Sequence, residues 1–138
     1  MIMKAKLNLV IAAAGKGSRS GLNFPKCLYE VEGIPIIVRI IRVALNFTEN
    51  ITIIVSKKGR KKIESCCKKW KVTAEFILQS SQKGMGDAVL AFQNSRYFNK
   101  SNDTLLFWGD IPFVKKNTLK ELVDLHYKNQ CHLSFPTV

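Results

Sequence analysis

The chain has 138 residues, of which 46% are hydrophobic and 23% are charged, a balance typical of a folded globular domain. This composition excludes disordered and collagen-like proteins, and the length suits a single domain with its own core. A formal net charge of +12 favours anionic partners, but it does not distinguish nucleotides from nucleic acids or lipid head groups.

The longest apolar run, residues 7–14, is far shorter than the roughly 20 residues that a membrane span needs. The first residues show no pattern of a secretory signal. We therefore expect a cytoplasmic protein with no membrane association. The four cysteines show no Cys-x-x-Cys spacing, and the adjacent Cys66 and Cys67 cannot form an ordinary disulfide, so we expect structural thiols.

The first predicted element is a buried strand, the apolar run from Leu7 to Ala14. It is followed by a glycine-rich stretch over residues 15–19, and Pro25 and Lys26 come six residues later. Two glycines let the backbone N–H groups approach an anion, and the nearby cations supply charge, so we interpret the stretch as a phosphate-binding loop. A simple tight turn is the alternative, but a turn does not require the flanking cations.

The loop does not match the two common nucleotide motifs. Ser20 occupies the place where the dinucleotide fingerprint needs its third glycine, and no Gly-Lys-Ser/Thr sequence of the Walker type is present. The loop must therefore be interpreted through its own spacing.

Strand and helix signals alternate along the rest of the chain. After a short extended piece at Leu28–Val31, we expect further strands at Ile51–Ser56, Ala74–Leu78, Thr104–Trp108 and His132–Val138. We expect helices from Pro35 to about Phe47, from Lys58 to Trp70, from the glycine pair Gly84 and Gly86 to near Phe98, and from Asn117 to Tyr127, the last capped by Asn117 or Thr118. This alternation predicts an α/β fold with a mostly parallel sheet covered on both faces.

Ligands of such sheets bind beyond the carboxyl ends of the strands. The glycine-rich loop, Gln79 and the pair Gly109 and Asp110 all follow predicted strands directly. We therefore expect these residues to meet at one edge of the sheet.

The stretch Ala13-Ala14-Gly15-Lys16-Gly17-Ser18-Arg19, followed by Pro25-Lys26, resembles the signature of the sugar-nucleotide pyrophosphorylases. These nucleotidyltransferases join a nucleoside triphosphate to a sugar 1-phosphate. Gln79 and the segment 84–88 look like the part of the uridyltransferase members that contacts uracil, and the segment 108–113 looks like their Tyr-Gly-Asp-x-Pro-Leu. Within the family, the likeness is strongest to the pyrophosphorylase domain of N-acetylglucosamine-1-phosphate uridyltransferases.

The resemblance implies a Rossmann-like three-layer α/β/α fold of the nucleotide-diphospho-sugar transferase type. It implies a Mg²⁺-dependent reaction of a nucleoside triphosphate, expected to be UTP, with a sugar 1-phosphate, releasing pyrophosphate. Arg19 and Lys26 would be catalytic, and Asp110 would ligate Mg²⁺. The expected nucleotide-binding residues are Ala12, Ala13, Ala14, Gly15, Gly17, Lys26, Gln79, Gly84, Met85, Trp108 and Gly109.

The chain departs from the family pattern at three positions: Met85 replaces a threonine, Asp87 replaces a histidine or related residue, and Trp108 replaces a tyrosine. The family's catalytic domain also continues further, so we expect residues 1–138 to be the N-terminal, nucleotide-binding portion of a truncated domain. We expect weak triphosphate binding, little turnover, and self-association through the unpaired edge of the strand His132–Val138.

Three other functions stay open. The chain could bind nucleotides without turnover, or it could resemble the cytidylyltransferases that use an alcohol phosphate or choline phosphate. A nucleic-acid binder is more remote. The basic cluster over residues 57–71 is better explained as a solvated helix face, because no aromatic residues are interleaved for base stacking.

Overall fold

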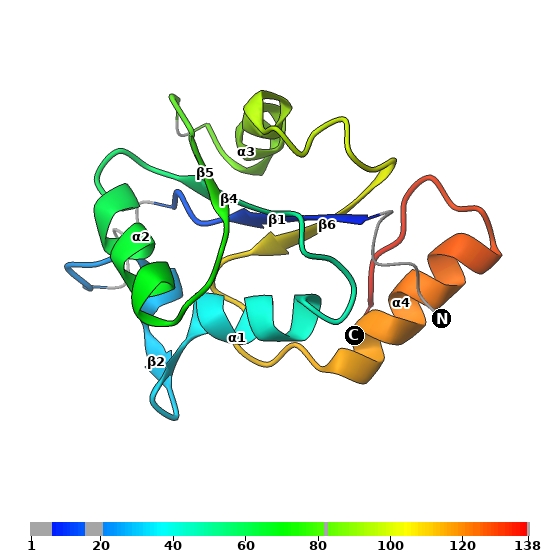
Figure 1. The fold of residues 1–138 in the computed structure, drawn as a ribbon, viewed down its shortest axis with the longest axis horizontal. Coiled ribbons are helices and arrows are strands. Elements are labelled where there is room, and N and C mark those ends of the chain that lie inside the picture. The colour runs from blue at the N-terminus through cyan, green and yellow to red at the C-terminus, as the bar shows by residue number, and fades with distance from the viewer. Residues whose placement is uncertain (1–6, 16–20, 82, 138) are drawn as a thin grey trace.

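The computed structural model describes residues 7–15, 21–81 and 83–137 (Figure 1). The strands are β1 (Leu7–Ala12), β2 (Glu30–Val31), β3 (Ile34–Pro35), β4 (Ile51–Val55), β5 (Glu75–Leu78) and β6 (Asp103–Trp108). The helices are α1 (Ile36–Ala44), α2 (Arg60–Lys69), α3 (Met85–Ala91) and α4 (Lys116–Lys128), with short 3-10 turns η2 (Lys26–Leu28) and η3 (Phe92–Asn94). None of the described helices is long and apolar enough to cross a membrane.

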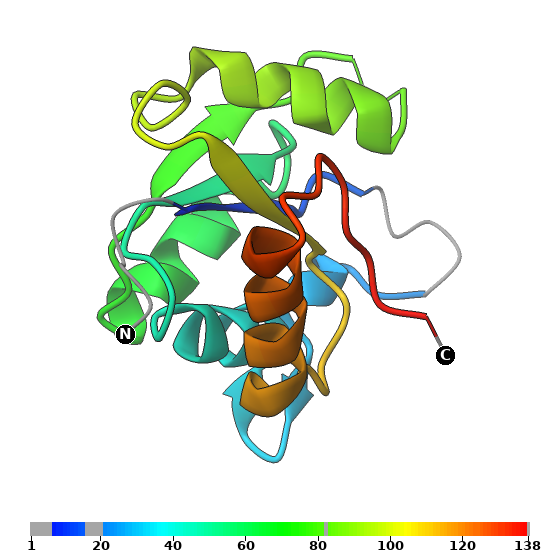
Figure 2. The same ribbon diagram turned by 90° about the vertical axis from the view of Figure 1, so that its right-hand side faces the viewer.

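The main sheet has four strands in the order β5-β4-β1-β6, and all its neighbouring pairs are parallel. The register places Ile11 of β1 beside Ile53 on one side and Phe107 on the other. β1 and β4 are apolar along most of their length because both of their faces are covered. Figures 1 and 2 show α3 on one face of the sheet and α1, α2 and α4 on the other. The predicted three-layer α/β/α fold is confirmed.

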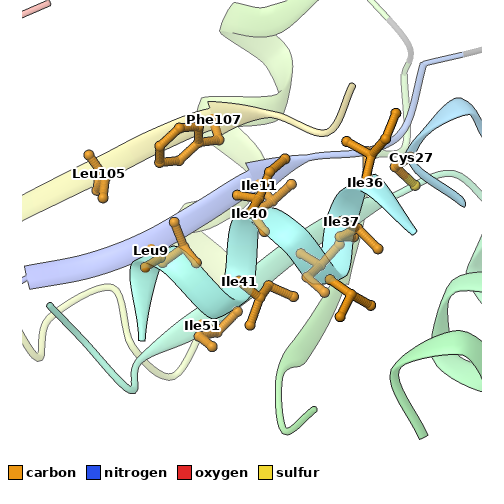
Figure 3. Packing of buried hydrophobic residues seen from close by; sticks show 14 of the residues in the cluster. Leu9, Ile11, Cys27, Ile36, Ile37, Ile40, Ile41, Ile51, Leu105 and Phe107 are labelled. Carbon is orange, nitrogen blue, oxygen red and sulfur yellow. The ribbon is translucent and has the colours of Figure 1, made fainter. Parts of the chain in front are cut away.

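The larger hydrophobic core lies between the sheet and α1. This helix has apolar residues on nearly every side, and Ile37, Ile40 and Ile41 are each at most 1% exposed. Figure 3 shows them packed under Leu9 and Ile11 of β1. Burying an isoleucine side chain contributes roughly 1.5–3 kcal/mol, so this interface anchors the strand that leads into the predicted phosphate loop.

A smaller core lies on the opposite face of the sheet. Val10 and Ile54 project from β1 and β4 toward Ala88 of α3 and Phe92 of η3. Leu9 and Val10 therefore enter different cores, as the two-residue period of a strand requires. This second core holds α3 over the same strands that position the site.

Three local predictions are wrong. The segment from His132 to Thr137 forms no helix or strand, and Figure 2 shows it leaving α4 as an irregular coil, so self-association through a C-terminal strand has no basis. One contact that holds this segment is a hydrogen bond of 2.9 Å between His126 Nδ1 and Ser134 Oγ. α4 begins at Lys116 with no side-chain cap, so neither Asn117 nor Thr118 is its cap.

The third error concerns the helix that follows Gly84 and Gly86. The sequence predicts that this helix ends near Phe98. α3 ends at Ala91 and passes through η3 to an extended Ser95. The Ser95 hydroxyl lies 2.8 Å from Thr52 Oγ1 and donates to Glu75 Oε2 at 2.6 Å. These buried contacts tie the chain to β4 and β5 and stop the helix.

Candidate active site

The carboxyl ends of β1, β4, β5 and β6 meet at one edge of the sheet because the strands are parallel. The backbone continues the ladder just beyond these ends. Ala13 donates from its N–H to the Ile54 carbonyl at 2.8 Å, and Gln79 donates to the Val55 carbonyl at 2.9 Å. The positions of Ala13–Gly15, Gln79 and Gly109 directly after their strands therefore agree with the predicted convergence.

Gly109 fits closely against the end of β1. Its N–H donates to the Ala12 carbonyl at 2.9 Å. A Cβ atom at Gly109 would lie 3.2 Å from that carbonyl oxygen, 3.2 Å from Cys27 Cβ and 3.3 Å from Ala13 Cβ. A side chain at this position would crowd all three atoms, which would have to shift by a few tenths of an ångström to admit it.

Lys26 begins η2, and its side chain is exposed to solvent. The next residue, Cys27, is 3% exposed and anchors the turn beneath it. Burial raises the pKa of the Cys27 thiol to about 12, with smaller contributions from neighbouring groups that include the Asp110 carboxyl. The buried Cys27 and the close fit of Gly109 thus bring Lys26 and Asp110 to the same part of the edge.

Gln79 follows β5, which lies on the opposite side of β4 from β1, and only 8% of its surface is exposed. Its side-chain Nε2 donates to Asp87 Oδ2 at 2.8 Å, to the Gly84 carbonyl at 3.1 Å and to the Ser81 carbonyl at 3.3 Å. The Ser81 hydroxyl donates to the second carboxylate oxygen of Asp87 at 3.1 Å. The hydrogen bond from Gln79 is the main cause that lowers the pKa of Asp87, so this carboxyl is ionised at neutral pH.

Gly84 starts α3 with a φ of +103° and a ψ of −166°, a conformation that side chains other than that of glycine rarely adopt. The neighbouring Met85 is half-buried and packs against the smaller core. The glycine thus allows the chain to turn from the Gln79 loop into the helix that carries Asp87.

Trp108 and Asp110 are both exposed at the end of β6, on either side of the buried Gly109. Among the residues that the structure describes, no group of three or more His, Cys, Asp or Glu side chains could hold a metal ion. The exposed Asp110 carboxylate is an oxygen ligand of the kind that a hard cation such as Mg²⁺ prefers.

The described candidate residues form two groups separated by β4. Ala12, Ala13, Lys26, Gly109 and Asp110 lie at the ends of β1 and β6, whereas Gln79, Gly84 and Met85 lie beyond β5. Ala14 is buried and Gly15 is exposed, immediately after β1. Gly17 and Arg19 lie outside the described residues.

Sequence reasoning identified Asp87 as a departure from the family pattern but gave it no role, and it overlooked Ser81. In the structure, Asp87 accepts hydrogen bonds from both the Gln79 side chain and the Ser81 hydroxyl. The sequence does place three polar residues, at positions 79, 81 and 87, on either side of a glycine that precedes a predicted helix. A tight turn at that glycine brings such residues together.

Comparison with known proteins gives a consistent assignment. A family model described as the MobA-like NTP transferase domain matches residues 9–138. The bifunctional protein GlmU of Buchnera aphidicola subsp. Schizaphis graminum is 32% identical over 121 residues, covering 88% of this chain and 25% of the relative. The GlmU of Syntrophomonas wolfei is 32% identical over 125 residues, covering 91% of this chain and 27% of the relative.

Solved structures show the same fold at lower identity. A UDP-glucose pyrophosphorylase from Acinetobacter baumanii superimposes with a TM-score of 0.66 at 19% identity, over 91% of this chain and 54% of that one. A 4-diphosphocytidyl-2C-methyl-D-erythritol synthase from Anaerococcus prevotii gives 0.66 at 18% identity, over 91% and 53%. The chain spans about a quarter of the length of the curated relatives it matches and about half that of these structures.

Proposed function

Because the chain belongs to the MobA-like NTP transferase domain family, we propose that it is the nucleotide-binding portion of a nucleotidyltransferase that joins UTP to a sugar 1-phosphate. The observation that carries this proposal is the meeting of Lys26, the Ala12–Gly15 backbone and Asp110 at one edge of the sheet. A cation, backbone N–H groups and a carboxylate are the groups that a triphosphate with its counterion requires. The Ala13 N–H is used by the sheet, so the N–H groups would come from Ala14 onward. The match to a model described as an NTP transferase domain supports the choice of a nucleoside triphosphate substrate.

In the proposed reaction an oxygen of the sugar 1-phosphate attacks the α-phosphorus of UTP. A new oxygen–phosphorus bond forms, the bond to the bridging oxygen breaks, and pyrophosphate leaves with the electron pair. The attacking oxygen is already ionised at neutral pH, so the site needs no general base. Catalysis then depends on positioning the two phosphates and neutralising their charge.

Lys26 and Arg19 are the proposed catalytic residues. Lys26 is exposed at the start of η2, where its ammonium group can reach an α-phosphate bound over the end of β1. We assign Arg19, from the glycine-rich loop, to the β- and γ-phosphates that leave. Both side chains would stabilise charge that develops in the transition state.

Asp110 fits the proposed Mg²⁺. A hard cation prefers carboxylate oxygens, and Mg²⁺ is commonly held by one or two carboxylates together with water and substrate phosphates. The exposed Asp110 supplies one such ligand, and the absence of a larger ligand cluster among the described residues suits a metal that arrives with the triphosphate. Bound Mg²⁺ would neutralise charge on the phosphate oxygens.

A second candidate is triphosphate binding without turnover. It is favoured by the fact that the chain covers about a quarter of the GlmU relatives, so groups that bind the sugar could lie in the rest of such a protein. A cytidylyltransferase using an alcohol phosphate or choline phosphate is a variant of the same chemistry. The cytoplasmic location expected from the sequence stays a prediction.

Two assays test the proposal together. The first measures pyrophosphate release from UTP and N-acetylglucosamine 1-phosphate with Mg²⁺, and the second measures thermal unfolding with UTP, CTP, ATP and GTP. A ligand that binds the native state raises the midpoint by mass action. Stabilisation by UTP with pyrophosphate release supports transfer, and stabilisation without release supports the binding module. No stabilisation by any triphosphate contradicts both.

A further inference from the structure

We propose that Asp87 is a positioning residue that sets base specificity, because it holds the Gln79 amide with its NH₂ group turned inward. The face of Gln79 that remains available to a nucleobase then offers a hydrogen-bond acceptor. This inference rests on the proposed function, since it concerns how the same site distinguishes one nucleoside triphosphate from another.

The orientation of Gln79 follows from the chemistry of its partners. The three atoms around Nε2 are a carboxylate oxygen of Asp87 and the backbone carbonyls of Gly84 and Ser81. All three can only accept hydrogen bonds while Asp87 is ionised. Turning the amide over would place Oε1 against three acceptors and lose a charge-assisted bond, so one orientation is strongly favoured.

Asp87 itself is held in place. Its Oδ1 accepts from the Ser81 hydroxyl and its Oδ2 accepts from Gln79, so the two carboxylate oxygens have different donors. Asp87 also lies in the first turn of α3, whose Ala88 is buried in the smaller core. Packing therefore holds the helix turn that carries Asp87, and hydrogen bonds hold its carboxylate.

The other end of the Gln79 amide is open. Within the described part of the chain, Oε1 accepts no hydrogen bond from the protein, and it is not among the fully buried polar atoms without partners, which belong to Asn8. Among the described residues, Oε1 is therefore left without a protein donor. It is an acceptor whose donor can come from a ligand.

An acceptor selects bases by the hydrogen on their ring nitrogen. Uracil and thymine carry a hydrogen on N3, whereas the N3 of cytosine is itself an acceptor. Cytosine could satisfy Oε1 only through its exocyclic N4 amino group, which requires a shifted base position. Met85, beside the same turn, has no hydroxyl that could offset a mismatch. The locked Gln79 amide thus favours UTP over CTP at this site.

The test compares affinities for UTP, CTP and inorganic tripolyphosphate by calorimetry with Mg²⁺, in the wild type and in Asp87→Ala and Asp87→Asn. We expect the wild type to prefer UTP over CTP by about tenfold, the value of one well-formed hydrogen bond. Asp87→Ala removes the charged partner and leaves only the Gly84 and Ser81 carbonyls to orient the amide, so the preference should fall below about threefold, while tripolyphosphate affinity stays unchanged. Asp87→Asn, which can donate or accept, should give an intermediate ratio.

Asp124→Ala is the matched control, because it removes an exposed carboxylate that pairs with Lys120 on α4. Its ratio should equal that of the wild type. Circular dichroism melts establish that each variant is folded, and the near-isosteric Asp87→Asn keeps the test valid if Asp87→Ala unfolds. An unchanged UTP preference in both folded Asp87 variants overturns the role of Asp87 while nucleotide binding stands. If the wild type binds neither UTP nor CTP, the proposed function and this inference both fail.

Discussion

Replacing Gly109 with alanine tests whether the close contact between the ends of β1 and β6 positions the site. The added Cβ would lie 3.2–3.3 Å from the Ala12 carbonyl oxygen, Cys27 Cβ and Ala13 Cβ. These atoms belong to the backbone or to its first side-chain atom, so no flexible side chain can move aside. The backbone at the ends of β1 and β6 would have to shift by a few tenths of an ångström instead.

Overpacking of this kind typically costs about 1–3 kcal/mol of unfolding free energy. For a chain of this size, each kcal/mol lowers the melting temperature by roughly 4 °C. We also expect weaker UTP binding, because the displaced Ala12 and Ala13 lead into the proposed phosphate-binding loop. Urea denaturation followed by circular dichroism measures the first effect, and calorimetry measures the second.

Gly86→Ala provides the matched control. A Cβ at Gly86 would meet no heavy atom within 4 Å among the described residues, and Gly86 lies in α3. Alanine is a better helix former than glycine by up to about 1 kcal/mol, so this variant should be as stable as the wild type or slightly more stable. A Gly109→Ala protein that is as stable as Gly86→Ala would refute the close-packing argument.

Three further predictions follow. Lys26→Ala and Arg19→Ala should each lower triphosphate affinity or the rate of transfer. Each should change the unfolding free energy by less than about 0.5 kcal/mol. Normal affinity in both variants would remove the phosphate-site assignment. Asp110→Asn should weaken Mg²⁺-dependent triphosphate binding, as measured by UTP titrations at several Mg²⁺ concentrations; an unchanged metal dependence would leave Asp110 without a metal role. Burial raises the pKa of Cys27 and of Cys67 to about 12, so both thiols should resist a thiol reagent at pH 8 until urea is added. As pH rises above the ordinary thiol pKa of 9.0, the unfolded chain loses these protons before the folded chain does, so the unfolding free energy should fall. Fast labelling of either cysteine in the native protein would contradict the burial of these thiols.

The elements that could be predicted from the sequence are those dominated by burial. β1 and β4 are apolar on both faces, and α1 has the helical spacing of an interior helix, so pattern alone identified them. The segment His132–Thr137 has an apolar pattern too, yet Leu133 is 78% exposed and Phe135 is 69% exposed. Local pattern could not show that none of the described strands pairs with it.

The candidate site was predictable where its residues follow strands, as at Gln79 and Gly109. It was not predictable where the role depends on a contact between side chains. The hydrogen bond between Gln79 and Asp87 depends on the turn at Gly84, whose φ of +103° the sequence suggests only through the glycine. The fit of Gly109 against Cys27 likewise joins residues from distant parts of the chain.

The central claim, a triphosphate site at the carboxyl edge of the sheet, is tested most directly by amide chemical shifts during a titration with UTP and Mg²⁺. The account predicts shift changes at Ala13–Gly15, at Gln79–Met85 and at Gly109–Asp110, and little change in α2 or α4. This pattern would distinguish a specific binding site from nonspecific electrostatic attraction to a chain of net charge +12. Changes confined to the lysine-rich α2, with none at the ends of β1 and β6, would contradict it.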